Sequence, residues 1–377
     1  MNLRVVHIIG GGEFGGAEEH IIDLLKQLKN SQVKCEVICF YDSLFAELLR
    51  ELDIPVLVLD YGRFDVRLLF GLSKALKEKN PDIIHTHGVK ANFFTRIAAR
   101  KLKQSVVITT VHSLLKYDYS HPVSYKLASF LEMTTRARTD YFIAVSNKIK
   151  EQLLSENRKP SQVKVIHHGI DVEEFSPKED NEAELLASEW KGDGDPFIVG
   201  SVGRIHPVKG FSIFIDACAQ LHNEYPGRFR FVLIGEGSER EALEEKVEKY
   251  GLSDVFLFAG FRKDIATCLR AFDGYVNSSL SEGLGLSVME ALATGVPVVT
   301  TNVGGIKDFA RHKENSYVVE RSNSKQLAEG ILRLQEDKQL AEQLAKQGVA
   351  DMRERFSQER MGKETLEYYQ TCIEEKQ

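Results

Sequence analysis

Residues 5–29 read VVHIIGGGEFGGAEEHIIDLLKQLK. The apolar run from Val5 to Ile9 predicts a buried strand, and a loop rich in glycine follows it at once. From Ala17 to Lys29 the apolar residues recur with the spacing of an amphipathic helix. A strand, a glycine loop and a helix in this order are typical of the first unit of a doubly wound parallel α/β sheet.

The same alternation of short apolar runs and helical patterns continues along the chain. We expect strands at 5–9, 33–40, 56–59, 82–85, 106–110, 141–145 and 163–166, and then at 197–202, 229–234, 255–258, 274–277 and 296–300. Strands that are buried between helices on both faces of a parallel sheet show this rhythm. The two groups of strands therefore predict two α/β domains.

The rhythm breaks between these groups. Residues 171–195 are acidic and end near Gly192, Gly194 and Pro196, which is the composition of a linker. We therefore place the N-terminal domain at residues 1–180 and the C-terminal domain after it. The charged tail that begins at Ser324 is expected to be helical.

Length and composition narrow the class of protein. The chain has 377 residues, of which 43% are hydrophobic and 28% charged, enough apolar matter for two sizeable cores. The formal net charge of −6 disfavours a general nucleic-acid binder, so no nucleic acid is expected as partner. Residues 90–164, however, hold 14 basic and 5 acidic residues. Such a block can attract an anionic substrate or give peripheral membrane contact, or can simply be solvated helix surface.

The five cysteines are scattered and odd in number, which is typical of core residues in a reduced compartment. The apolar run at the N-terminus is too short for a signal peptide, and no stretch approaches the roughly 20 apolar residues of a membrane span. We therefore expect a cytoplasmic protein, at most peripheral at the inner face of the cell membrane.

The first glycine loop has a pattern that is typical of nucleotide binding. Gly10, Gly12 and Gly15 fit the G-x-G-x-x-G pattern of dinucleotide binding, between a strand and a helix. An NAD-dependent dehydrogenase would also need an acid after the second strand, and Asp42 could serve, although it comes late. A flexible turn without any ligand is the alternative.

The loop after the first strand of the C-terminal domain reads GRIHPVKG, from Gly203 to Gly210. The guanidinium of Arg204 and the ammonium of Lys209 would lie beside glycine backbone, and together they could bind a phosphate group as a clamp. A surface loop with incidental charges would read the same way.

Residues 278–291, SSLSEGLGLSVMEA, form the richest motif. A glycine loop that enters a helix near Ser287 would offer backbone N–H groups and a positive helix end to a diphosphate. Glu282 and Glu290 could then hold sugar hydroxyls on either side. Alternatively, Ser287 and Glu290 form a capping box that only closes the start of the helix.

Three histidines fall at predicted strand ends, namely His85, His87 and His112. This position suits a hydrogen bond to substrate, although such histidines can also be structural. A three-histidine zinc site is conceivable, but the acids that would support it are not evident.

The motifs together resemble those of the retaining GT-B glycosyltransferases of family 4, also described as glycosyl transferases group 1. The resemblance runs in order over nearly the whole chain: Gly15-Gly16-Ala17-Glu18, Gly169-Ile170-Asp171 with Phe175, Gly203-Arg204 with Lys209-Gly210, Gly235-Glu236-Gly237, Gly260-Phe261, and Glu282 to Glu290 spaced as E-x7-E. It implies the GT-B fold, with two Rossmann-like doubly wound domains facing across a cleft. It also implies that a C-terminal helix, about 357–377, crosses back to the acceptor-binding domain 1–180 and leaves 181–356 for the nucleotide sugar.

The resemblance assigns roles to residues of the C-terminal domain. It implies that Arg204 and Lys209 bind the donor diphosphate beside Gly203, that Glu282 contacts the donor sugar, and that Glu290 binds ribose. The backbone of Gly283, Leu284, Gly285, Leu286 and Ser287 would face sugar and phosphates, and that of Phe261 and Arg262 would hold the base.

In the N-terminal domain, the resemblance implies that Gly15 and Gly16 approach the diphosphate or the acceptor and that His112 lies beside the transferred sugar. Two departures from the family pattern concern peripheral contacts. Lys307 and Asp308 stand where proline and glutamate are usual, and His168 stands where asparagine is usual.

The activity implied is metal-independent transfer of a hexose from a nucleotide-diphosphate sugar, with UDP favoured, retaining the anomeric configuration and without a cofactor. The acceptor is unknown, and the basic block suggests an anionic or lipid-linked one in polysaccharide or glycolipid synthesis. A nucleotide-sugar 2-epimerase and a non-catalytic nucleotide-sugar binding protein remain alternatives.

Overall fold

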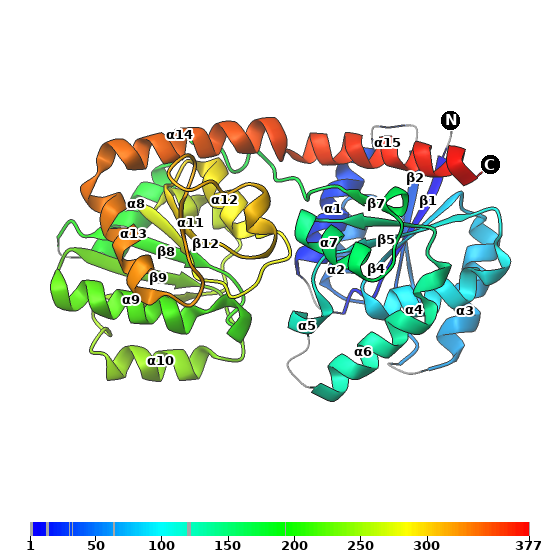
Figure 1. Cartoon of the computed structure of the whole chain (residues 1–377), viewed down its shortest axis with the longest axis horizontal. Coiled ribbons are helices and arrows are strands. Elements are labelled where there is room, and N and C mark those ends of the chain that lie inside the picture. The colour runs from blue at the N-terminus through cyan, green and yellow to red at the C-terminus, as the bar shows by residue number, and fades with distance from the viewer. Residues whose placement is uncertain are drawn as a thin grey trace. The chain divides into compact units, whose positions relative to one another are not determined.

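A computed structural model describes residues 3–12, 15–29, 31, 33–62, 65–118, 122–192 and 194–376 of the chain. The chain folds as two compact units (Figure 1). Unit 1 comprises Met1–Gly169 and Gln358–Gln377, and unit 2 comprises Ile170–Ser357.

Unit 1 is built on a parallel sheet of seven strands in the order β3-β2-β1-β4-β5-β6-β7. The strands are β1 (Leu3–Ile9), β2 (Val33–Cys39), β3 (Val56–Val58), β4 (Ile83–His87), β5 (Val106–Val111), β6 (Tyr141–Ala144) and β7 (Val163–Val165). The order reverses between β1 and β4, where a doubly wound sheet opens a crevice for ligands at the carboxyl ends of its strands.

Helices cover both faces of this sheet. They are α1 (Gly16–Leu28), α2 (Leu44–Glu51), α3 (Arg67–Lys79), α4 (Val89–Ala98), α5 (Leu115–Asp118), α6 (Pro122–Thr135), α7 (Asn147–Ser155) and α15 (Gln358–Lys376). On one face, the last helix α15 packs beside α1, and Tyr369 is fully buried with Leu24 and Ile83 in a shared core (Figure 1). Burial of this face therefore depends on the C-terminal end of the chain.

Unit 2 holds a six-stranded parallel sheet in the order β10-β9-β8-β11-β12-β13. Its strands are β8 (Phe197–Val202), β9 (Phe229–Ile234), β10 (Phe256–Gly260), β11 (Gly274–Asn277), β12 (Val298–Thr301) and β13 (Tyr317–Val319). Its helices are α8 (Asn181–Lys191), α9 (Phe211–Glu224), α10 (Arg240–Lys249), α11 (Ile265–Arg270), α12 (Leu286–Thr294), α13 (Ser324–Glu336) and α14 (Lys338–Arg355). The order reverses between β8 and β11, so a second crevice is expected at their carboxyl ends.

The segment that was expected to be a linker is part of unit 2. The division falls after Gly169, eleven residues before the predicted boundary at 180. Asp180 caps α8 by accepting hydrogen bonds from the second and third residues after it, and Trp190 of α8 is buried against Phe272, with ring centroids 5.4 Å apart. An acidic composition is compatible both with a solvated linker and with a helix that buries only a narrow face. The packing of Trp190 shows that this segment is such a helix.

Two further expectations can be compared with the structure. All five cysteines are free thiols, and four of them are buried. Among the residues that the structure describes, no helix is both long and apolar enough to cross a bilayer.

Candidate functional site

Two loops at the carboxyl edge of the unit 2 sheet lie against each other. The N–H of Gly203, after β8, donates to the carbonyl of Ile234, and the N–H of Gly235, after β9, donates to that of Gly260. Gly235 has φ +139, and a Cβ there would overlap the carbonyl oxygen of Gly203. Only glycine allows this approach, which brings the loops after three strands to one place.

The structure brings Lys209 and Glu282 into direct contact. Lys209 ends a short 3-10 turn, η4 (Pro207–Lys209), and its Nζ lies 2.7 Å from Oε1 of Glu282. The Oγ of Ser279 lies 2.6 Å from the same oxygen. The two charged side chains are only 22% and 10% exposed, so the ion pair is largely shielded from water.

The position of Glu282 is fixed by its backbone as well. Its carbonyl accepts a hydrogen bond from the N–H of Gly305, and Gly304 has φ +51 at a point where a Cβ would overlap that carbonyl. Both of these polar contacts go to Oε1, and no described residue forms a hydrogen bond or ion pair with Oε2. Glu282 is therefore anchored through one oxygen and can offer the other to a ligand.

Sequence reasoning included Ser279 in the motif 278–291 but assigned no role to it or to the glycines that follow β12. Ser279 lies at the end of β11 and also reaches Oδ1 of Asn277, at 2.8 Å. A polar run after a buried strand was the available signal, but nothing in it indicated which hydroxyl meets Glu282.

The helix after this loop begins without a side-chain cap. Its N-cap is Gly285, with φ +99, and α12 starts at Leu286, one residue before the predicted start. Ser287 is thus inside the helix and not at its N-cap. The predicted capping box of Ser287 and Glu290 is therefore wrong. The backbone N–H groups of the first turn remain suited to an anion.

Glu290 lies one turn into α12 and is half-buried. Arg204 is exposed in the loop after β8. Its charge reaches His206: burial lowers the pKa of that imidazole, and the neighbouring Arg204 cation lowers it further. The predicted phosphate clamp therefore consists of one exposed cation and one cation that is already paired with a carboxylate.

The predicted base-binding turn follows β10. The ring of Phe261 is 72% exposed, the kind of surface that can stack on a base. Arg262 is paired with Asp264, with Nε 2.9 Å from Oδ1, and this contact raises the pKa of the guanidinium.

In unit 1, the first glycine loop leads into α1. Gly15 is its N-cap in extended conformation, and both Gly15 and Gly16 are exposed; Glu13 and Phe14 lie outside the described residues. The first turn of α1 carries Glu18 and Glu19, whose charges oppose a diphosphate at that helix end and suit hydroxyl groups better. Asp42, the acid that a dehydrogenase would need, is ion-paired with Arg50 at 2.7 Å.

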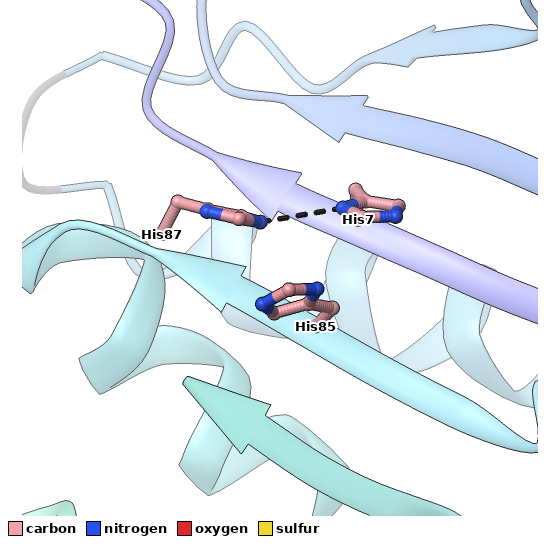
Figure 2. A group of neighbouring side chains, drawn as sticks. All are labelled: His7, His85 and His87. Atoms are coloured by element: carbon pink, nitrogen blue, oxygen red, sulfur yellow. Dashed lines mark hydrogen bonds between the residues drawn. The ribbon is translucent and has the colours of Figure 1, made fainter. Parts of the chain in front are cut away.

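Four histidines of unit 1 contact one another in a row: His7, His85 and His87 are buried, and His112, after β5, is half-buried. The Nδ1 of His7, on β1, lies 3.3 Å from Nε2 of His87, which lies on β4 as His85 does. Figure 2 shows this contact beside the ring of His85. The Nδ1 of His87 in turn lies 3.1 Å from Nε2 of His112. Parallel register places His7 directly beside His85. His7 was not among the predicted site residues.

Burial determines the protonation state of these four histidines. It lowers the pKa of His7 and of His112 to about 3 and holds those of His85 and His87 well below the usual value. The imidazoles are therefore neutral at pH 7, each able to donate through one nitrogen and accept through the other.

The sequence suggested a possible zinc site of His85, His87 and His112, but the structure groups a different set of three histidines. The trio whose ligand atoms lie within 4.8 Å of one another is His7, His85 and His87. Both nitrogens of His85 are already engaged, at 2.6 Å each, with the hydroxyls of Tyr369 and Thr110. The ring of His85 is thus satisfied by hydrogen bonds, whereas the buried Nε2 of His7 has no hydrogen-bond partner among the described residues. A metal held by His85 would have to break one of these bonds.

A cavity of about 880 Å³ opens beside these histidines within unit 1. His87 and His112 line it together with the glycine loop after β1 and residues of α4, α6 and α7. The sequence predicted that the acceptor binds to this domain, but it did not indicate that residues of α6 line the cavity.

The basic block of residues 90–164 does not form one free patch. Arg96 is fully buried and pairs with Glu132 at 2.6 Å. Arg136 pairs with Glu156, and Lys148 lies 3.1 Å from Glu151. Three of the fourteen cations are therefore paired with acids of the same block, and the basic excess lies with the other cations.

Comparison with known proteins gives matches over both halves of the chain. A family profile described as Glycosyl transferases group 1 matches residues 183–351, and one described as Glycosyltransferase Family 4 matches residues 14–174. The UDP-Gal:alpha-D-GlcNAc-diphosphoundecaprenol alpha-1,3-galactosyltransferase of Escherichia coli is 27% identical over 348 residues, covering 90% of this chain and 89% of that protein. The lipopolysaccharide core biosynthesis glycosyltransferase LpsD of Rhizobium meliloti (strain 1021) is 24% identical, covering 94% and 95%.

A comparison with solved structures also finds similarity over nearly the whole chain. Anabaena Alr3699/HepE in complex with UDP and glucose superposes with a TM-score of 0.85 at 25% identity, covering 98% of this chain and all of that one.

Proposed function

The chain belongs to glycosyltransferase family 4 and has the GT-B fold, and from this membership we propose that it transfers a hexose from a UDP-sugar to a lipid-linked acceptor, with retention of anomeric configuration. The carrying observation is the contact of Lys209 with Glu282 beside the uncapped N-terminus of α12. The galactosyltransferase relative is named for a UDP-sugar donor and a diphosphoundecaprenol acceptor, and the Anabaena structure contains UDP and glucose.

The donor diphosphate would bind in unit 2. Arg204 would contact it from the exposed loop after β8, and the N–H groups of α12 would face it from below. Lys209 would turn from Glu282 towards the leaving phosphate. We propose that these groups compensate its negative charge without a divalent metal.

Glu282 would hold the sugar through Oε2 while Oε1 stays bound to Ser279. A carboxylate fixed in this way accepts hydrogen bonds from sugar hydroxyls in a defined orientation. The reaction breaks the bond between C1 and the phosphate oxygen and forms one between C1 and the acceptor oxygen on the same face of the ring. The acceptor proton would pass to the departing phosphate.

The acceptor would bind in the cavity of unit 1. Neutral His87 and His112 line it and can hydrogen bond to hydroxyls without attracting a second anion. Lys90 and Lys116 also line this cavity and would suit the phosphates of a lipid-diphosphate carrier. The proposal places the protein in the synthesis of cell-envelope polysaccharide or glycolipid.

Calorimetry with UDP tests the donor site. Arg204→Ala should weaken UDP binding by about 2 kcal/mol, roughly thirtyfold, because a charge-assisted hydrogen bond is lost. Lys249→Ala, which removes an exposed cation of α10, is the matched control and should leave affinity unchanged. Equal affinity of the wild type and Arg204→Ala would contradict the phosphate clamp.

Turnover tests the reaction. Glu282→Gln should lower transfer by at least about a hundredfold while UDP binding is retained or tightened, because Lys209 is released from the ion pair. Loss of UDP-sugar only when a lipid-diphosphate acceptor is present supports transfer, whereas epimerisation of the sugar without acceptor would contradict it. Activity abolished by chelator and restored by Mg²⁺ or Mn²⁺ would refute metal independence.

A further inference from the structure

Helix α6 presents an unusual apolar surface to solvent. Five of its fourteen residues are large, hydrophobic and exposed: Val123 (67%), Tyr125 (37%), Leu127 (48%), Phe130 (58%) and Met133 (63%). Val123, Leu127 and Phe130 follow at intervals of four and three residues, so they form one stripe along the helix. A contiguous apolar stripe on a surface helix marks an interaction site.

The orientation of α6 is fixed by the fold. Its Glu132 accepts hydrogen bonds from the buried Arg96 and from Asn92 of α4, both at 2.6 Å, and Ala128 packs inward. The helix lies on α4, at the margin of unit 1 (Figure 1). Because this buried ion pair holds the inner face, the helix cannot turn its apolar stripe inward without breaking it.

Charges around the stripe favour an anionic partner. Lys126 is exposed on α6 itself, and Arg138 is exposed in the turn after the helix. The helix α5 before it carries one cation, the exposed Lys116, and one acid, Asp118. Glu132 is the sole acid in the sequence of α6, and Arg96 neutralises it. Apolar side chains flanked by cations match the surface of an anionic bilayer, where acyl chains take the former and headgroup phosphates the latter.

A second face of the same helix reaches the cavity. Tyr125, Ser129 and Met133 line it together with His112. A lipid carrier embedded in a bilayer under α6 would therefore have its diphosphate and sugar next to the cavity, without leaving the membrane.

We propose that α6 is the membrane-docking element of this protein and that its stripe of Val123, Leu127 and Phe130 inserts at the surface of a bilayer containing anionic lipid. The presentation of a lipid-linked acceptor to the cavity rests on the proposed function, whereas the docking itself does not.

Vesicle flotation tests the docking. The wild type should float with vesicles of phosphatidylcholine containing about 30% phosphatidylglycerol, and Phe130→Glu should weaken this binding at least about tenfold. The matched control is Phe70→Glu, since Phe70 is an equally exposed phenylalanine of unit 1 on α3, at 71%. It should bind vesicles as the wild type does. Circular dichroism checks that both variants are folded.

Three outcomes would overturn the proposal. The wild type fails to float with anionic vesicles, or Phe130→Glu and Phe70→Glu bind equally well, or sedimentation shows a wild-type dimer that Phe130→Glu converts to monomer, which makes the stripe an interface between copies. Calorimetry with UDP on the same proteins separates this proposal from the preceding one. Flotation without UDP binding contradicts the proposed function alone, and UDP binding without flotation contradicts the docking alone.

Discussion

Acidification should unfold unit 1 before unit 2. Burial lowers the pKa of His7 and of His112 from 6.5 to about 3, so their rings stay neutral in the folded protein while the unfolded chain takes up protons below pH 6.5. Stability is therefore complete above pH 6.5 and falls with decreasing pH, by about 1.4 kcal/mol per pH unit for each histidine. At about pH 5, the two histidines together remove about 4 kcal/mol, a large part of the typical 5–15 kcal/mol of a folded protein.

The chain contains its own reporter for this experiment. Its single tryptophan, Trp190, is buried against Phe272 in unit 2, so tryptophan fluorescence follows unit 2 alone. Hydrogen exchange of peptides from β4 and β5 follows unit 1. Urea titrations between about pH 7.5 and pH 5 should show a steep loss of unfolding free energy in unit 1 and a much smaller loss in unit 2.

A single substitution tests the cause. His7→Asn keeps a polar group facing His87 and removes one titrating ring, so it should lower the pH dependence of unit 1 by about 1.4 kcal/mol per pH unit. An unfolding free energy of unit 1 that stays constant between pH 7.5 and pH 5, or an unchanged slope in His7→Asn, would refute the neutral state of these histidines.

Three further substitutions have defined outcomes. Gly304→Ala should lower transfer activity at least about tenfold, measured by UDP release, because its Cβ would displace the carbonyl of Glu282. Arg96→Met should destabilise unit 1 by about 3 kcal/mol, since it leaves Glu132 without its buried partner, and hydrogen exchange should accelerate in α6. Glu290→Gln should change the free energy of unfolding of unit 2 by about 0.5 kcal/mol at most, because Gly285 is the N-cap of α12, and should weaken UDP binding about tenfold; an unchanged affinity for UDP would contradict the ribose contact.

The fold class was readable in the sequence because strands of a parallel sheet are buried on both faces. Runs such as Val5–Ile9 and Phe229–Ile234 are therefore mostly apolar, with one polar residue each (His7 and Arg230), and glycines mark the loops that follow several of them. The three-residue strand β13 (Tyr317–Val319) was missed although β3 and β7 are equally short, since charged and polar residues surround it on both sides in the sequence. The start of α12 was placed one residue late, because a glycine N-cap leaves no side-chain signal.

The sequence alone thus determined the two α/β units and which loops carry charge and glycine, because burial and turn geometry act on neighbouring residues. Only the tertiary structure decided what those loops bring together. Lys209 meets Glu282 across 73 residues, and His85 meets Tyr369 across 284. Strand order and register determine which distant residues come into contact; for example, the register of β1 and β4 places His7 beside His85. The exposed stripe of α6 belongs to the same class, because a helix with apolar residues on several sides reads as buried until the packing around it shows which side faces water.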